Sequence, residues 1–389
     1  MKKNIILIAL FLSVSLVFAQ PEGQKKTIHD LMATGTIDFI QDKEKAIRAF
    51  TIVISMDPNY VKAYYMRGQS YYGLGQYKKA LYDFDKMKEL EPDNDKAYAL
   101  TALILDEADD IFNALQNYST AIKLNPENAN YYFSRAKIQH KYKNYWYAIK
   151  DYEKSIELGN KTQDVYYHKG ITELYIQHYK EALVSFEASM ELGKQDKDAY
   201  YYRGYTRMFL TNFEDALEDF DMVIAFDENY APAYFHKGFI YLEKKDYKQA
   251  LNFYNKGIKI NPQVSRAYHN RGLVYKALEK NDKALADFNI CIKYEPKFPD
   301  AYLNRALIFE KKEEFTKALN DYDSYLRIVP SNPTVIYARG RMKLREGIEI
   351  GACNDFRLAA EMGNKQAIKA VKDICDQLES TKKIKEGIE

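Results

Sequence analysis

The chain has 389 residues, enough for two or three ordinary domains, and its 47% hydrophobic and 29% charged residues indicate a folded rather than a disordered protein. The formal net charge is +2, and without Lys2 and Lys3 the chain has 55 basic and 55 acidic residues. This balance argues against a nucleic-acid partner, which favours a strongly basic surface.

The first twenty residues have the three parts of a secretory signal peptide. Lys2 and Lys3 precede an apolar run at 5–18, and small or modest side chains end that run at the positions that signal peptidase reads. The weaker alternative is an uncleaved membrane anchor, because a span needs roughly 20 apolar residues. We expect residues 1–19 to be removed, 20–26 to be a polar lead-in, and the protein to be exported, either periplasmic or secreted, with no membrane span after cleavage.

A unit of 34 residues then repeats ten times without insertion across 27–366. In every repeat an alanine stands at position 20 and an aromatic residue at position 24. The alanines are Ala46, Ala80, Ala114, Ala148, Ala182, Ala216, Ala250, Ala284, Ala318 and Ala352, and the aromatic residues are Phe50, Phe84, Tyr118, Tyr152, Phe186, Phe220, Tyr254, Phe288, Tyr322 and Phe356. A fixed period of this length indicates a stacked array with one continuous core.

Each repeat is expected to form two helices. In the clearest repeat, 61–94, apolar residues at helical spacing occur at 62–74 and 77–90, with Gly75 between them. The repeats begin at Thr27, Val61, Asp95, Ala129, Gln163, Lys197, Ala231, Ser265, Pro299 and Pro333. A further amphipathic helix is expected at 367–378, where it would cover the open end of the array, and a charged tail follows at 379–389.

This pattern resembles the tetratricopeptide repeat (TPR) family over about nine tenths of the chain. The shared features are a small residue at position 8, alanine at 20, an aromatic residue at 24 and proline at 32. Where the family has tryptophan at position 4, eight consecutive repeats have Tyr64, Tyr98, Tyr132, Tyr166, Tyr200, Tyr234, Tyr268 and Tyr302. The resemblance implies an all-α fold, a right-handed α-solenoid of ten helix-turn-helix repeats with a carboxyl-terminal capping helix.

Arginine at position 7 and aspartate at position 23 occur together in six repeats, and three others have neither. The predicted pairs are Arg67 with Asp83, Arg135 with Asp151, Arg203 with Asp219, Arg271 with Asp287, Arg305 with Asp321, and Arg339 with Asp355. We interpret them as structural ion pairs between the two helices of a repeat, although shared ancestry of the repeats could produce the same pattern. If exposed, each pair contributes only about 0–1 kcal/mol.

The resemblance also implies a concave groove lined by positions 2, 5, 9, 12 and 13 of the first helices. In the fifth to seventh repeats these positions carry an apolar, largely aromatic patch of Tyr167, Ile171, Leu174, Tyr201, Tyr205, Phe209, Phe235 and Phe239. An exposed apolar patch usually marks an interaction site, but these side chains could instead pack against neighbouring repeats. No repeat has the asparagine at position 9 that the family's carboxylate clamp uses.

The cysteines and histidines suggest structure rather than catalysis. We predict a disulfide between Cys353 and Cys375 at the end of the array, and Cys291 as a buried hydrophobic residue. The six histidines form no metal-binding motif, and no phosphate-binding loop or nucleophile elbow is present. We therefore expect no catalytic residues, no metal and no cofactor.

The sequence predicts a non-enzymatic scaffold that binds a peptide or protein segment in the aromatic groove. The alternative is an accessory subunit of an envelope assembly or secretion complex that docks through its convex face or its ends. Substitutions in the groove would abolish binding in the first case and spare it in the second.

Overall fold

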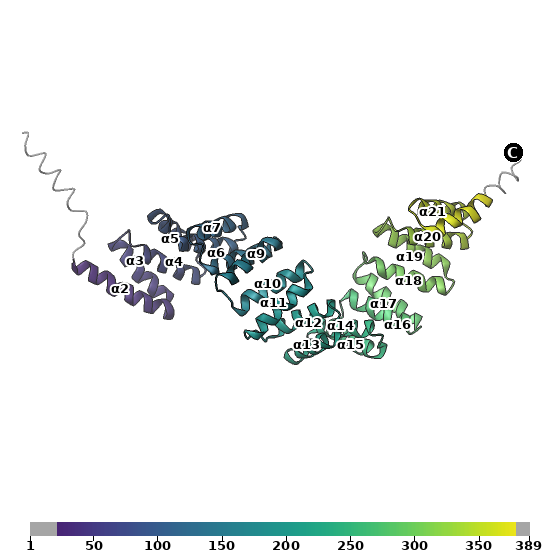
Figure 1. Cartoon of the computed structure of the whole chain (residues 1–389), viewed down its shortest axis with the longest axis horizontal. Coiled ribbons are helices and arrows are strands. Elements are labelled where there is room, and N and C mark those ends of the chain that lie inside the picture. The colour runs from purple at the N-terminus through teal and green to yellow at the C-terminus, as the bar shows by residue number, and fades with distance from the viewer. Residues whose placement is uncertain (1–21, 379–389) are drawn as a thin grey trace, which may run out of the picture. The chain divides into compact units, whose positions relative to one another are not determined.

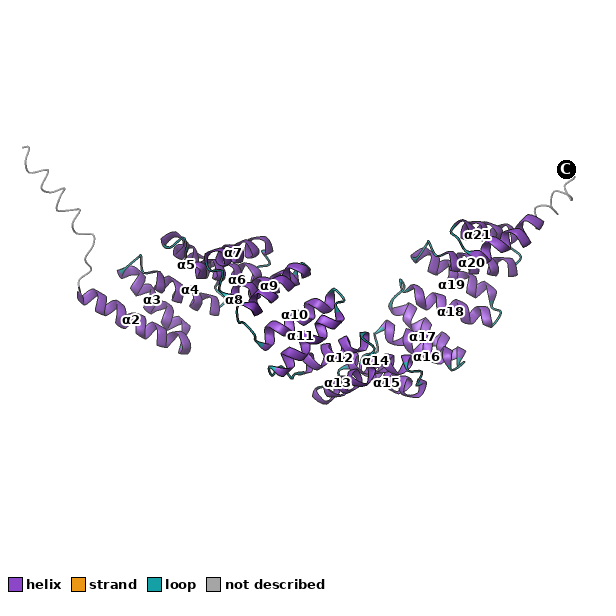
Figure 2. Cartoon of the chain, in the orientation of Figure 1, coloured by secondary structure: helices purple, strands orange, loops and turns teal. Residues whose placement is uncertain are grey.

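The computed structural model describes residues 22–378, with side chains from residue 27, and every element in this part of the chain is helical (Figure 2). The predicted signal peptide and charged tail lie outside the described residues. The described helices are α2 (Glu22–Gln41), α3 (Lys43–Met56), α4 (Val61–Gly73), α5 (Tyr77–Leu90), α6 (Asp95–Glu107), α7 (Ile111–Leu124), α8 (Ala129–Lys141), α9 (Tyr145–Glu157), α10 (Gln163–Tyr175), α11 (Tyr179–Glu191), α12 (Lys197–Phe209), α13 (Phe213–Phe226), α14 (Ala231–Glu243), α15 (Tyr247–Ile260), α16 (Ser265–Ala277), α17 (Asn281–Tyr294), α18 (Pro299–Lys311), α19 (Phe315–Ile328), α20 (Pro333–Arg345), α21 (Glu349–Glu361), α22 (Lys365–Ala370) and the π-helical turn η1 (Val371–Cys375).

These helices confirm the all-α solenoid, with ten helix pairs followed by a short cap (Figure 1). Two boundaries differ from the prediction. Helix α2 begins at Glu22, so most of the segment expected to be a polar lead-in is helical, and the cap begins at Lys365. The chain divides into two compact bodies, Met1–Lys194 and Gln195–Glu389, which are called here the N-terminal and C-terminal bodies.

The core of each repeat lies between its two helices. The alanine at position 20 is fully buried in all ten repeats, and the aromatic ring at position 24 is no more than 4% exposed. Position 8 must be small because this ring lies against it. In the eighth repeat, a Cβ atom added to Gly272 would lie 2.7 Å from Cε1 of Phe288.

The tyrosine at position 4 connects one repeat to the turn that precedes it. The hydroxyl of Tyr64 donates a hydrogen bond to the carbonyl oxygen of Pro58 at 3.1 Å, and Tyr302 does the same to Pro296 at 3.2 Å. Tyr98 and Tyr234 make equivalent bonds. A phenol therefore satisfies a carbonyl in the turn between repeats.

From the second repeat to the tenth, the turn inside the repeat has a left-handed residue at position 15. Nine consecutive repeats have a positive φ there, at Gly75, Asp109, Lys143, Gln177, Thr211, Lys245, Glu279, Glu313 and Gly347. The next residue closes the turn, as when the amide of Lys280 donates to the carbonyl of Tyr275 at 2.9 Å. Seven of the nine residues are not glycine, so each of them bears the steric cost of this conformation.

The end of the array is tied by a disulfide. An S–S bond joins Cys353 of α21 to Cys375 of η1, whose Cα atoms are 5.6 Å apart. Both cysteines are buried with Phe356 and Ala370 in one apolar cluster, while Cys291 is a buried free thiol in the eighth repeat. The bond therefore holds the cap against the second helix of the tenth repeat.

Replacing the strained residue at position 15 with glycine should stabilise the protein. We expect Glu279→Gly, at φ 57°, to raise the free energy of unfolding by about 0.5–1 kcal/mol, because glycine removes a steric cost that exceeds its own entropic cost. Urea unfolding followed by circular dichroism measures this change. Gly347→Ala is the matched control, since φ is 76° there and no atom lies within 4 Å of the new Cβ, and it should lower stability. Equal stability of all three proteins would contradict the strain argument.

Breaking the disulfide should loosen the cap. The bond closes a loop of 22 residues in sequence separation. Loop-closure entropy then gives a loss of about 3 kcal/mol on Cys353→Ser with Cys375→Ser. Thiol titration of the unfolded, unreduced chain should find one free thiol, Cys291, and urea unfolding should show the loss in the double variant. Three free thiols would show that the bond does not form.

Candidate functional site

The first helices of successive repeats meet through positions 5 and 6. In the N-terminal body, the rings of Phe133 and His168 are 5.9 Å apart, and in the C-terminal body those of Tyr201 and His236 are 5.7 Å apart. His269 Nε2 likewise lies 3.2 Å from Nδ2 of Asn304. We call the surface along these first helices the first-helix face. It is formed by α8 and α10 in the N-terminal body and by α12, α14, α16 and α18 in the C-terminal body. It carries the predicted groove residues.

Three predicted residues lie on α10 of the N-terminal body. Tyr167 is buried, with 9% of its surface exposed, and the Nζ of Lys194 lies 4.4 Å from the centre of its ring. Ile171 and Leu174 are half-buried. The ring with the largest exposure on this helix belongs to Tyr175, 61% exposed, which the predicted set did not include. Tyr167 therefore offers little surface to a ligand.

The exposed ring of Tyr175 is held in place by neighbouring aromatic residues. It stacks on Tyr145 with centroids 5.5 Å apart and meets the imidazole of His140 edge-on at 5.2 Å. His140 Nδ1 lies 2.9 Å from the hydroxyl oxygen of Thr172. The Thr172 hydroxyl donates its own proton to the carbonyl oxygen of His168 at 2.7 Å, so Nδ1–H of His140 is the donor to Thr172. Burial lowers the pKa of His140, so its ring is neutral at pH 7.

Helix α12 of the C-terminal body carries a continuous row of rings. Tyr201 stacks on Tyr205 at 6.1 Å with an interplanar angle of 19°, and Tyr205 meets Phe209 edge-to-face at 4.9 Å. Tyr201 and Tyr205 are half-buried, and Phe209 is 45% exposed. This spacing of four residues places the three rings on one side of the helix.

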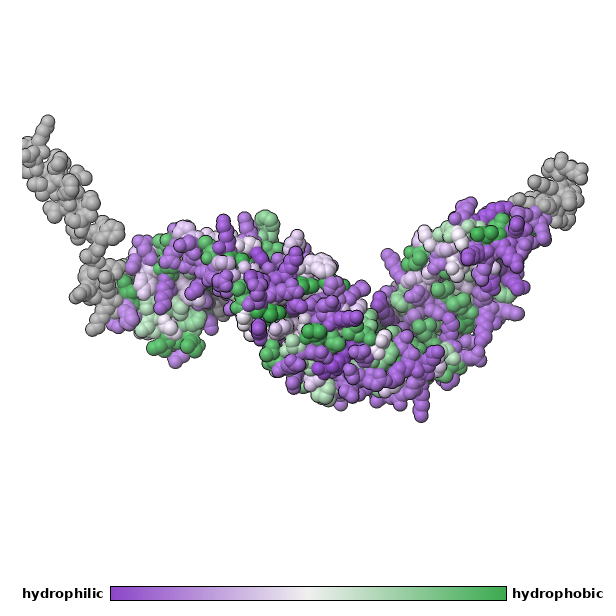
Figure 3. Space-filling model, viewed as in Figure 1, coloured by the Kyte–Doolittle hydropathy of each residue, from purple (hydrophilic) through white to green (hydrophobic). Residues whose placement is uncertain are grey.

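The remaining two predicted residues, on α14, contribute more to packing than to the surface. Phe235 lies over Gly257, where an added Cβ would come within 2.6 Å of Phe235 Cδ1, so it joins the two helices of the seventh repeat. Phe239 is half-buried against the cluster that contains Phe220. Figure 3 accordingly shows hydrophobic side chains interrupted by hydrophilic ones on the side in view, rather than one unbroken apolar surface.

His236 organises the row on α12. Its ring stacks on Phe220 at 5.3 Å and meets Tyr205 edge-on at 5.0 Å, and its Nε2 lies 3.1 Å from the hydroxyl of Tyr201. Burial lowers its pKa to about 4, so the imidazole is neutral at pH 7 and Nε2 can accept from the tyrosine. Sequence reasoning missed this role, because an isolated histidine at position 6 fits no binding motif.

The six predicted arginine–aspartate pairs lie between the two helices of their repeats, with shortest nitrogen–oxygen distances of 2.6–2.7 Å. All six are two-pronged, with Nε and Nη2 of the arginine bonded to different carboxylate oxygens. The aspartate side chains are only 0–9% exposed. The pairs are therefore largely buried rather than exposed, and removing the cation alone would leave a costly unpaired carboxylate.

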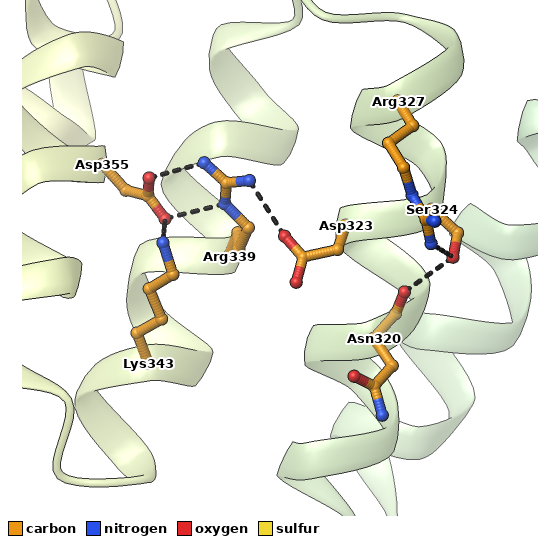
Figure 4. Close-up of polar contacts among 7 residues, drawn as sticks. All are labelled: Asn320, Asp323, Ser324, Arg327, Arg339, Lys343 and Asp355. Atoms are coloured by element: carbon orange, nitrogen blue, oxygen red, sulfur yellow. Dashed lines mark hydrogen bonds and ion pairs between the residues drawn. The ribbon is translucent and has the colours of Figure 1, made fainter.

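The arginines also reach the preceding repeat, which the sequence reasoning missed. Nη1 of Arg271 donates to Oδ1 of Asn255 at 2.7 Å, and Nη1 of Arg339 lies 2.9 Å from Oδ1 of Asp323 (Figure 4). For five of the six arginines the oxygen acceptor is at position 25 of the previous second helix. The other examples are Thr51 for Arg67, Ser119 for Arg135 and Asn289 for Arg305. These acceptors differ in residue type, so the repeat pattern has no recurring residue at position 25 that would indicate them.

Repeats without the pair use other charged groups. In the fifth repeat Lys169 pairs with the buried Glu173, which also accepts a hydrogen bond from Ser185 at 2.6 Å. In the seventh, the buried Lys237 pairs with Asp221 at position 25 of the sixth repeat. In both repeats a cation at position 7 therefore still meets a carboxylate.

The described residues offer little sign of a reaction centre. Among them, no group of three or more histidine, cysteine or acidic side chains could hold a metal ion. None of the helices described has a stretch long and apolar enough to cross a membrane. The candidate site is therefore a surface of aromatic rings, one patch on each body.

Three family models match parts of the chain. A model described as tetratricopeptide repeat matches residues 61–94 and 231–264, a second with the same description matches 269–333, and one described as TPR repeat matches 110–142. The chain thus contains tetratricopeptide repeats. No curated protein matches it.

Solved structures resemble the fold. The C-terminal part of a TPR repeat-containing protein from Cytophaga hutchinsonii has a TM-score of 0.51 and 16% identity, with 61% of this chain and 99% of that chain covered. YrrB, a TPR protein with an unusual peptide-binding site, has 26% identity and a TM-score of 0.41, with 47% and 95% covered. Yeast Tom70 has 15% identity and a TM-score of 0.45, with 92% and 97% covered.

Removing one partner of a buried pair should destabilise the C-terminal body. Arg271→Met leaves Asp287, 3% exposed, without its cation and should lower the free energy of unfolding by about 3 kcal/mol or more. Arg271→Met combined with Asp287→Leu should recover most of this loss, because neither charge is then buried. Urea unfolding of the full cycle measures the coupling. Lys86→Met, which breaks the exposed contact with Glu89, is the control and should have no measurable effect. Equal effects of Arg271→Met and Lys86→Met would refute the burial argument.

Proposed function

We propose that this protein is a non-enzymatic scaffold that binds a peptide or protein segment along its first-helix face. The observation that carries the proposal is the ring row of Tyr201, Tyr205 and Phe209 on α12. Large rings with few rotamers to freeze are the side chains that contribute most to protein interfaces. The tetratricopeptide repeat resemblance supports the same assignment, because that family is expected to bind peptides on its first helices.

The centre of the proposed site is narrower than the predicted patch. Phe235 and Tyr167 are committed to packing, whereas Phe209 has an accessible ring and Tyr205 is supported by His236. Rings that are already held by their neighbours lose little freedom when a ligand arrives. The C-terminal body therefore offers the better organised of the two patches.

An extended segment suits this arrangement. Packed helices are spaced by about 8–10 Å, and an extended chain advances about 3.3 Å per residue, so every third residue of a ligand would meet a new first helix. Ligand side chains at that spacing would pass from the rings of α12 to Phe239 on α14 and Leu273 on α16. An apolar residue every third position is the ligand pattern that we propose.

The cellular setting follows from the sequence alone. The segment at 1–19 has the parts of a signal peptide, and we propose that the scaffold acts after export, in the periplasm or outside the cell. An accessory subunit of an envelope assembly or secretion complex remains the second candidate. Its support is the exposure of Phe226 on α13 and Tyr294 on α17, which are second helices that the proposed groove does not use.

Selection of binders from a phage-displayed library of random dodecapeptides tests the groove. We expect enriched peptides whose apolar residues recur every third position. Tyr205→Glu with Phe209→Glu should weaken their binding, measured by fluorescence polarisation, at least about tenfold. Met222→Glu on α13 is the control, since it adds the same charge to the same body at a side chain that is 40% exposed, and it should bind normally. Circular dichroism establishes that all variants are folded. Failure to enrich any peptide, or equal affinity in the double variant, would overturn the proposal.

A further inference from the structure

Three aromatic side chains stand out on the second helices of the N-terminal body. Phe112 of α7 is 76% exposed, and Trp146 and Tyr147 of α9 are 61% and 66% exposed. They occupy positions 18 and 19 of the third and fourth repeats, and equivalent positions of neighbouring repeats lie side by side in a stacked array. These three residues, with Asn113 and Gln116, are called the outer patch.

The outer patch departs from the pattern of the other repeats between the second and the ninth. At position 18 the remaining repeats from the second to the ninth have Lys78, Lys180, Glu214, Lys248, Asp282 and Thr316, which suit a solvated surface. Helix α7 also has no acidic residue and only one basic residue, Lys123, in its last turn. Its exposed side chains Asn113 and Gln116 are uncharged. A surface that combines aromatic rings with a lack of charge has the composition of an interface centre.

The tryptophan is supported by its neighbour. His178, which precedes α11 in the next repeat, meets the ring of Trp146 edge-on at 5.1 Å with an interplanar angle of 78°. This contact leaves most of the indole exposed while restricting its rotation. A large ring that is held before association costs little entropy to bury. The patch is thus prepared for contact rather than loosely exposed.

Charges of both signs surround the patch. Lys143 and Lys150 are exposed near α9, and so are Asp109 and Glu153. A strongly acidic or basic partner, or an anionic membrane, would be better matched by a rim of one sign. A rim of mixed sign is complementary to its own copy, because a twofold axis can bring each lysine opposite a carboxylate.

We propose that the outer patch is the contact surface between two copies of this chain, which pair it with itself about a twofold axis. The uncharged centre permits this arrangement, since a charged centre would face its own charge across the axis. The contact uses the second helices of the N-terminal body, so it leaves the first-helix face of each copy available. The proposal does not depend on peptide binding in the groove.

Trp146 is the only tryptophan of the chain, and its emission therefore reports on this surface alone. Upon dilution of the purified full chain from high to low micromolar concentration, we expect its emission to shift to longer wavelength as the indole returns to water. Sedimentation velocity over the same range should show a dimer converting to a monomer. A chain that is monomeric throughout, with unchanged emission, would overturn the proposal, and so would a dimer whose Trp146 emission matches that of the monomer.

Substitutions in the outer patch test whether the dimer contact lies there or elsewhere on the molecule. Phe112→Glu with Tyr147→Glu keeps the tryptophan and should raise the dimer dissociation constant at least about tenfold, with an unchanged circular dichroism spectrum. Tyr82→Glu on α5, at a side chain that is 57% exposed in the same body, is the control and should dimerise normally. A dimer that survives the double variant would place the contact elsewhere.

A cysteine placed in the patch gives an independent readout. Asn113→Cys should form a disulfide between copies under mild oxidation, because equivalent atoms meet near a twofold axis. Lys283→Cys, at the same repeat position in the C-terminal body, is the control and should remain a thiol. Equal crosslinking of both variants would contradict the proposed surface.

Discussion

A buried carboxylate that must be paired is the constraint on which the stacking of this array depends. Asp287 is 3% exposed, and Arg271 from the other helix of the same repeat pairs with it. Burial raises the pKa of the equivalent Asp83, and the hydrogen bond from Arg67 opposes that effect. The planar guanidinium has donors left after it satisfies the aspartate, and one of them bonds to the previous repeat. One side chain thus fixes both the angle between two helices and the register between two repeats.

Aromatic residues divide between this framework and the surface. The ring at position 24 is always buried, and the tyrosine at position 4 serves the turn between repeats while its face carries an arginine, as with Arg271 over Tyr268 at 5.4 Å. The tyrosines at these two positions are therefore structural. What remains for binding is the small set whose positions vary among repeats, such as Tyr205 and Phe209, and these are the residues that a ligand could distinguish.

The period and the residue types were enough to predict the ten helix pairs, their order and the residues between the helices, because position 8, 20 and 24 contacts lie within one repeat. The site was less predictable. Phe235 was expected on the surface, yet it packs over Gly257, a residue that lies 22 positions away and is not part of the repeat pattern. The acceptor that the arginines reach in the preceding repeat was missed. Threonine, serine, asparagine and aspartate all supply an oxygen at position 25, but no one residue type recurs there. The left-handed conformation at position 15 could not be predicted either, since the turn imposes it whether or not the residue is glycine.

Because every repeat solves the same packing problem, a departure from the common pattern needs a cause. Some departures are compensated inside the fold: Lys169, Glu173 and Ser185 together replace one arginine–aspartate pair. The outer patch on α7 and α9 has no such compensation, since Phe112 and Trp146 are more than half exposed and gain no stability from burial while they remain in water. An exposed aromatic side chain lowers solubility and adds nothing to the core. Its presence is best explained by a partner surface that buries it. The common repeat pattern therefore serves as an internal reference for each position. Among the described residues, the ring row of α12 and the outer patch are two places where packing alone does not account for the residues present.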